Sequence, residues 1–184
     1  MLTVYHTGIE EIPKPDLRVG RKNADFGQGF YLSDDASFAL RWAKERKDTP
    51  CVLNVYRFDP NGLRIRRLYR CGIWYDYICT NRAGRSDPYA GYDAVIGPIA
   101  CDTLYDTWGI LTSGMIGKRL AVEAYRLGPY YRQIVLKSEK ALSGLCFVSA
   151  QTVAKEQIAK NRAVVKQEEQ AYQEKMLQLL DSGE

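Results

Sequence analysis

The sequence has only one histidine, His6, and its five cysteines form no C-x-x-C pair. A structural zinc site uses four Cys or His ligands, so zinc here would require thiolates drawn from distant parts of the chain. We therefore predict no metal site. The single imidazole also means that any Ser-His or Cys-His catalytic pair would depend on His6. We expect the cysteines to be reduced and mostly buried: Cys51, Cys71, Cys79, Cys101 and Cys146.

Long apolar runs are missing as well. No stretch approaches the roughly 18 apolar residues that span a bilayer. The segment Met1-Leu2-Thr3-Val4-Tyr5 lacks the basic and apolar regions of a signal peptide and instead has the pattern of a strand. We expect a cytoplasmic protein that does not engage a membrane.

Several sequence motifs of enzymes are absent. There is no Walker A sequence, no G-x-S-x-G and no H-E-x-x-H. The glycines of Asp25-Phe26-Gly27-Gln28-Gly29 do not form a dinucleotide fingerprint either, because the third glycine is missing. These absences exclude the commonest nucleotide-binding, hydrolase and zinc-protease patterns.

What is present fits one globular domain with a modest positive charge. The chain has 184 residues, of which 46% are hydrophobic and 26% charged, with a net charge of +4. Basic residues cluster in Arg64-Ile65-Arg66-Arg67 and around Arg82 and Arg85, close to several of the thirteen tyrosines. Such a surface permits an anionic partner, but it does not specify one.

Hydrophobic periodicity predicts short strands early and late in the chain, with helices between them. The absence of a regular β-α-β rhythm favours an α+β fold. The predicted strands are residues 2–6, 29–32, 52–58 paired with 63–65, 92–96, 133–137 and 141–147. The predicted helices are 35–46, 74–81 and 119–126, and a loop is expected over 109–117.

The composition changes near residue 151, where Gln, Glu, Lys and Ala begin to dominate and predict a long helix. We therefore divide the chain into a domain at 1–150 and a C-terminal helical extension at 151–184. The apolar residues Ile158, Val165, Tyr172 and Leu179 recur every seven positions. So sparse a stripe favours packing on the same chain over a free coiled coil, although a partner surface is an alternative.

Two early segments draw attention to a ligand pocket. The first is Val4-Tyr5-His6-Thr7-Gly8 at the first predicted strand, and the second is Asp25-Phe26-Gly27-Gln28-Gly29-Phe30-Tyr31-Leu32-Ser33. Read separately, His6 is most simply a surface or core residue and Tyr31 a core aromatic. Together they favour a nucleotide pocket.

In these segments the chain resembles the ADP-ribosyltransferase superfamily, in the branch related to diphtheria toxin and the poly-ADP-ribose polymerases. That branch has a His on the first strand, a Tyr on a following strand and a Glu or substitute on a late strand, matched here by His6, Tyr31 and Gln133. More closely, the chain resembles a bacterial family in which a small neighbouring gene is typical of toxin–antitoxin pairing. Further shared stretches are W-x-x-Y-I-x-x-N-R at residues 74–82 and Y-D-A-V-I-G-P-I-A-x-D-T at 92–103, and the resemblance covers about residues 1–150.

The resemblance implies a split antiparallel β-sandwich with flanking helices that binds NAD as co-substrate. His6 would bind the adenosine ribose, and Tyr31 would stack on the nicotinamide ring. The remaining residues implied at the NAD site are Thr7 and Gly8 for the carboxamide, Gly27, Gly29 and Phe30 for close backbone approach, and Arg18 or Arg21 for the pyrophosphate.

The third position departs from the family pattern. Cleaving the nicotinamide bond builds positive charge on the ribose, which a carboxylate stabilises, whereas the amide of Gln133 carries no charge. The resemblance then implies transfer of single ADP-ribose units. Glu123, Glu139 and Asp102 are alternative carboxylates that are more simply surface or capping residues, and Arg119 is an alternative acceptor-side contact.

The leading hypothesis is therefore a mono-ADP-ribosyltransferase, a bacterial toxin held in check by a small antitoxin-like protein. Its acceptor would be a protein or a nucleic acid, and the sequence does not decide between them. The alternatives are a catalytically inactive module that binds NAD or ADP-ribose, which Gln133 favours, and an NAD glycohydrolase.

Overall fold

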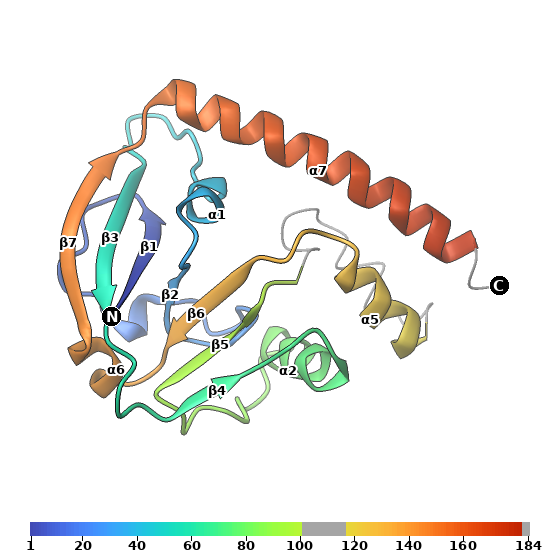
Figure 1. The fold of residues 1–184 in the computed structure, drawn as a ribbon, viewed down its shortest axis with the longest axis horizontal. Helices are drawn as coiled ribbons and strands as arrows, with labels where there is room; N and C mark the ends of the chain where they lie inside the picture. Colours follow the sequence, from blue (N-terminus) through green and yellow to red (C-terminus); the bar gives the residue numbers. More distant parts are fainter. Residues whose placement is uncertain (101–116, 182–184) are drawn as a thin grey trace.

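The computed structural model describes residues 1–100 and 117–181, which form two β-sheets with helices around them (Figure 1). The first sheet is antiparallel, with β3 in the middle of the order β1-β3-β7. The second has the order β2-β6-β5-β4, in which only β4 and β5 are parallel. The strands are β1 (Leu2–Gly8), β2 (Phe30–Leu32), β3 (Val52–Phe58), β4 (Ile65–Arg67), β5 (Ala94–Pro98), β6 (Arg132–Leu136) and β7 (Leu145–Thr152). The fold is thus α+β, as predicted.

The two central strands of the second sheet, β5 and β6, are buried on both faces, which fits their mainly apolar sequences. Along β6, Ile134 and Leu136 face the first sheet and pack there with Val4 and Tyr56. Val135, between them, faces the opposite side. This alternation places one core between the two sheets and a second core behind the second sheet.

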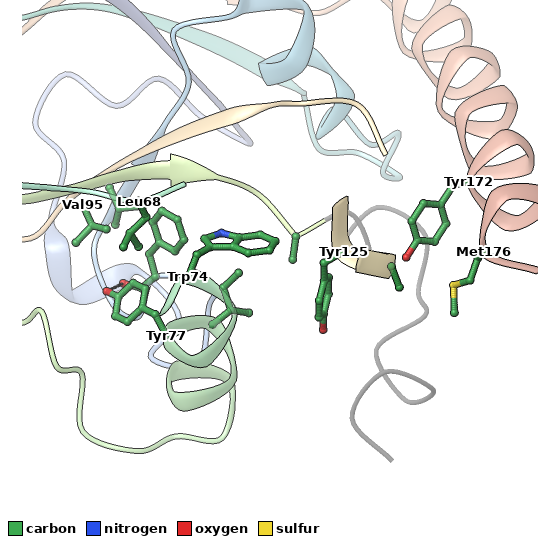
Figure 2. Packing of buried hydrophobic residues seen from close by; sticks show 12 residues of the cluster. Leu68, Trp74, Tyr77, Val95, Tyr125, Tyr172 and Met176 are labelled. Atoms are coloured by element: carbon green, nitrogen blue, oxygen red, sulfur yellow. Dashed lines mark hydrogen bonds between the residues drawn. The ribbon is translucent and has the colours of Figure 1, made fainter. Parts of the chain in front are cut away.

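Helices cover the outer face of the second sheet and enclose that second core. They are α2 (Gly72–Arg82), α5 (Lys118–Arg126) and α7 (Lys155–Asp181). Trp74 of α2 is fully buried, and its indole nitrogen donates to the carbonyl of Pro98 at 2.9 Å. Figure 2 shows Tyr172 and Met176 extending from α7 toward Tyr125 of α5, which closes this core from the far side.

The apolar stripe of α7 packs on the chain's own body, as the sequence predicts. Ile158 and Tyr172 are buried, and Val165 and Leu179 are half-buried. Ile158 packs beside Cys51, while Tyr172 belongs to the core behind the second sheet. Figure 1 shows α7 running from the end of β7 past α1 toward α5.

Two predictions about the strands are wrong. The strand expected at 63–65 lies at Ile65–Arg67 and pairs in parallel with β5, not with β3. Alternation identifies a strand, but its neighbour depends on contacts from far along the chain. The strand expected at 141–147 begins later, at Leu145, because the residues before it form a short helix, α6 (Glu139–Ser143). Ser138 caps the first turn of α6 by accepting from the backbone N–H of Ala141.

The helix expected over 35–46 is shorter than predicted. Asp35 caps α1 (Ala36–Arg41) by accepting from the N–H groups of Ser37 and Phe38. Beyond Trp42 the chain makes a tight turn closed by an Arg46–Thr49 bridge, with Asp48 at a φ of 55°. Left-handed backbone of this kind is incompatible with a continuing helix.

The four described cysteines form no disulfide, but they are not mostly buried, contrary to prediction. Cys51 is buried and Cys79 is half-buried, whereas Cys71 and Cys146 are exposed. Cys101, Asp102 and nearly all of the loop expected over 109–117 lie outside the described residues. The other element of the described residues is a 3₁₀ turn at Leu17–Val19. Within residues 1–100 and 117–181, no helix is long and apolar enough to cross a membrane.

Candidate functional site

A cleft opens where the two sheets meet. Tyr5 of β1 and Ser33, just after β2, exchange two backbone hydrogen bonds of 2.8 and 3.0 Å. Beside this bridge lies a cavity of about 540 Å³, within the range of roughly 300–1,000 Å³ usual for small-molecule sites. Its lining residues are Tyr5, His6, Thr7, Arg21, Ala24, Asp25, Tyr31, Leu32, Ser33, Phe38, Ala39, Trp42, Lys44, Arg46, Ile99 and Gln133.

His6 is held in a defined orientation on β1. Its Nδ1 lies 2.7 Å from the backbone oxygen of Tyr31, and its ring lies against Phe30 with centroids 4.7 Å apart. Burial lowers the pKa of His6, an effect that the hydrogen bond to Tyr31 partly opposes. The ring is therefore neutral at pH 7. Because a carbonyl oxygen only accepts, Nδ1 carries the proton, and Nε2 is left as a hydrogen-bond acceptor.

Tyr31 is fixed through its hydroxyl group. That oxygen accepts from the N–H of Phe26 at 3.0 Å and donates to the carbonyl of Gly27 at 2.7 Å. Burial raises the pKa of the Tyr31 hydroxyl well above its ordinary range, so the group stays protonated. With its hydroxyl occupied by the 25–28 loop, Tyr31 offers the cleft its aromatic ring alone.

Gln133 reaches the same cleft from β6. In the β2–β6 register Tyr31 lies opposite Val135, so Tyr31 and Gln133 are diagonal neighbours on one face of the sheet. Gln133 is only 7% exposed, and its Nε2 has no hydrogen-bond partner among the described residues. A buried amide without a partner carries a desolvation cost of about 1–3 kcal/mol, which a bound ligand can offset. Gln133 is therefore the clearest candidate for contact with a ligand.

The charges around the cleft are mainly positive. Arg21, Lys44 and Arg46 line it, and none of them has an ion-pair partner within residues 1–100 and 117–181. Asp25 is the only carboxylate that lines the cleft in that part of the chain, and it pairs with Arg82 at 2.6 Å. The cleft is thus suited to an anionic ligand.

One wall of the cleft is aromatic, and the sequence analysis did not identify it. Phe38 of α1 and Trp42 just after it line the cavity, with their rings edge to face at 6.1 Å. Thr7 fastens this wall to β1 by donating from its hydroxyl to the carbonyl of Ala39 at 2.6 Å. The sequence places Phe38 and Trp42 within the helix expected over 35–46, but it gives no signal that this segment lies beside the cleft.

Five of the residues expected at the site lie beside the cleft without lining it. Arg18 pairs with Asp16 at 2.7 Å and is largely exposed, and Phe30 packs in the core between the sheets. Gly27 has a positive φ of 72°, and a Cβ added at this position would lie 2.7 Å from the carboxylate of Asp87. The other two are Gly8, against the His6 ring, and Gly29, packed on the backbone of Leu136.

Two of the alternative carboxylates, Glu123 and Glu139, do not line the cleft, and Asp102 lies outside the described residues. Glu123 lies in α5 and approaches Arg119 at 4.0 Å on the surface. Glu139 begins α6 and is exposed. Within residues 1–100 and 117–181, no group of three or more His, Cys, Asp or Glu side chains is arranged to hold a metal ion.

Comparison with known families gives one match. The family described as "Protein of unknown function (DUF3990)" matches residues 2–147, which is most of the chain. The chain belongs to this family. The DUF3990 match includes His6, Tyr31 and Gln133, and it ends before α7. Searches of curated proteins and of solved structures give no significant match.

Proposed function

We propose that this DUF3990 protein is a mono-ADP-ribosyltransferase with the fold of that superfamily, transferring ADP-ribose from NAD to a macromolecule. One observation carries the proposal. His6, Tyr31 and Gln133, which stand far apart in the sequence, line a single cleft together. The volume of the cleft and its unpaired cations suit a dinucleotide with a pyrophosphate.

Each of the three residues has a specific part in this proposal. The free Nε2 of His6 accepts from a hydroxyl of the adenosine ribose, and the backbone of Thr7, which lines the cleft, holds the carboxamide. The Tyr31 ring stacks on the nicotinamide, which an aromatic face without a free polar group serves well. Arg21 lies at the cleft and can pair with the pyrophosphate, whereas Arg18 is already paired with Asp16.

Gln133 orients the nicotinamide ribose through its unpaired amide. When the C1–N bond breaks, the ribose develops positive charge that no free carboxylate in the described part of the cleft balances, because Asp25 is neutralised by Arg82. Such a site favours slow transfer of single units over chain elongation. We further propose that the enzyme acts in the cytoplasm as a toxin restrained by a small protein partner.

Release of nicotinamide tests the proposal. The protein would be incubated with NAD carrying one label on nicotinamide and a second on the adenylate phosphate, with and without cell lysate. Release together with the phosphate label on a macromolecule supports transfer. Release with free ADP-ribose under both conditions identifies an NAD glycohydrolase. NAD binding without release identifies an inactive binding module.

A further inference from the structure

A second cavity adjoins the cleft. It has a volume of about 400 Å³ and lies between the turn after α1 and the start of α7. Arg46 lines both cavities, so the two are neighbours. The residues lining the second cavity are Glu45, Arg46, Lys47, Asp48, Lys155 and Arg162. We call this site the basic cavity.

The basic cavity carries an excess of cations. Its four basic side chains outnumber its two carboxylates, Glu45 and Asp48. Only Lys155 forms an ion pair, with Glu45 at 3.8 Å, and both of these side chains are exposed. Arg46, Lys47 and Arg162 have no ion-pair partner in the described part of the chain. Together with Lys44 in the cleft, they continue the positive charge from the cleft to the outer surface. Unpaired cations along a groove favour a ligand with repeated negative charges.

An aromatic side chain of the cleft comes shortly before Arg46, the residue that lines both cavities. Trp42 is 37% exposed, lines the cleft, and comes two residues before Lys44 and four before Arg46. An exposed indole costs free energy in water, and here it leans edge to face on Phe38 and is not buried in a core. Surfaces that bind single-stranded nucleic acid combine such stacking platforms with cationic grooves. An acidic peptide would use the cations but not the indole.

We propose that the basic cavity and Trp42 bind single-stranded nucleic acid, and that this nucleic acid is the acceptor of the transfer reaction. The backbone phosphates occupy the basic cavity, and a base stacks on Trp42 at the entrance to the cleft. The acceptor role, but not the binding, rests on the proposed function. In the transfer, the C1–N bond of NAD breaks and nicotinamide leaves with the bonding electron pair. A nitrogen or oxygen of the nucleic acid then bonds to C1 and releases its proton to solvent.

Binding is tested without catalysis. Fluorescence anisotropy would measure the affinity of the full-length protein for a fluorescein-labelled single-stranded 12-mer, as DNA and as RNA, at several salt concentrations. We expect the double variant Lys47→Gln/Arg162→Gln to reduce the slope of log K against log salt by roughly one to two. Trp42→Ala is expected to weaken binding about tenfold. The matched control is Lys160→Gln, which removes a charge from the same helix outside the cavity and should change neither quantity.

The acceptor role is tested with labelled NAD and the same oligonucleotide. The double variant is expected to release nicotinamide at the wild-type rate when no acceptor is present, and to label the oligonucleotide at least tenfold less. A higher KM for NAD in this variant would assign the basic cavity to NAD and overturn the proposal. Label found only on protein in a lysate would also overturn it.

The two proposals fail in different ways. If the wild-type protein releases no nicotinamide, the acceptor role falls together with the proposed function. The anisotropy experiment still decides whether the basic cavity binds nucleic acid. If nicotinamide is released but the 12-mer neither binds nor becomes labelled, the further inference alone is refuted.

Discussion

The guanidinium of Arg41 lies 2.9 Å from the carboxylate of Glu168, and this ion pair joins α1, the aromatic wall of the cleft, to α7. The hydroxyl of Tyr131 bridges the pair, 2.6 Å from Arg41 and 2.9 Å from Glu168. Tyr131 in turn stacks on Phe38 with ring centroids 4.6 Å apart. A helix outside the family match thereby holds the wall of the candidate site.

The first prediction is that Glu168→Ala destabilises the protein and weakens the site. Both partners of the ion pair are largely buried, so the substitution leaves the Arg41 charge without its acceptor. We expect the free energy of unfolding to fall by about 2 kcal/mol and the KM for NAD to rise. Denaturant unfolding and steady-state kinetics would measure these effects. Glu174→Ala, an exposed change on the same helix, is the control, and equal stability of the two variants would contradict the prediction.

The second prediction separates the ring of Tyr31 from its hydroxyl. Tyr31→Phe keeps the aromatic face but removes the partner of the Phe26 N–H and the Gly27 carbonyl. We expect a loss of about 1–3 kcal/mol in stability with kcat largely retained, whereas Tyr31→Ala should lose turnover as well. Tyr69→Phe, at a residue that is 70% exposed, should change neither. A loss of kcat in Tyr31→Phe would show that the hydroxyl takes part in the chemistry.

The third prediction concerns pH. Burial holds the folded-state pKa of His6 below its ordinary value of 6.5. Above pH 6.5 the ring is neutral in both folded and unfolded chains, so its contribution to stability is fully present. As the pH falls from 6.5 toward the lowered pKa, the unfolded chain binds the proton first and stability declines. His6→Gln should remove this part of the pH dependence, as denaturant unfolding at pH 5 to 8 would measure, and an unchanged profile would refute it.

The fourth prediction uses the unpaired amide of Gln133. Gln133→Leu keeps the size of the side chain and removes a buried polar group that has no partner among the described residues. We therefore expect unchanged or slightly higher stability together with a loss of nicotinamide release. Gln133→Glu should keep NAD binding and raise NAD hydrolysis, because it supplies the missing negative charge. If Gln133→Leu unfolds the protein, Gln133 is structural and not a ligand contact.

The sequence identified the parts of the fold whose signals are local. The strand patterns of β3 and β6 and the helical pattern of α2 are all readable within a few residues. The partners of the strands are not, since β4 pairs with β5 through contacts that no local pattern encodes. This is why the β3–β4 hairpin was predicted and is not found.

The same distinction applies to the candidate site. His6 and Tyr31 belong to short segments with recognisable patterns, and their meeting with Gln133 depends on the β2–β6 pairing. The Arg41–Glu168 pair joins α1 to α7, and the basic cavity lies between the turn after α1 and α7. Both connect positions that are more than a hundred residues apart along the chain. No spacing rule connects such positions, so in the sequence Glu168 and Arg162 are only two polar residues of the predicted C-terminal helix.

The pairing of β2 with β6 also bears on how the protein is made. Ser33 donates to the carbonyl of Arg132, which lies 99 positions further along the chain. The first strand of that sheet therefore cannot pair until most of the chain has been synthesised. The aromatic wall is completed later still, because Glu168, which holds α1 through Arg41, is synthesised after all the strands named above. A nascent chain therefore has no complete aromatic wall at the candidate site until α7 has been synthesised.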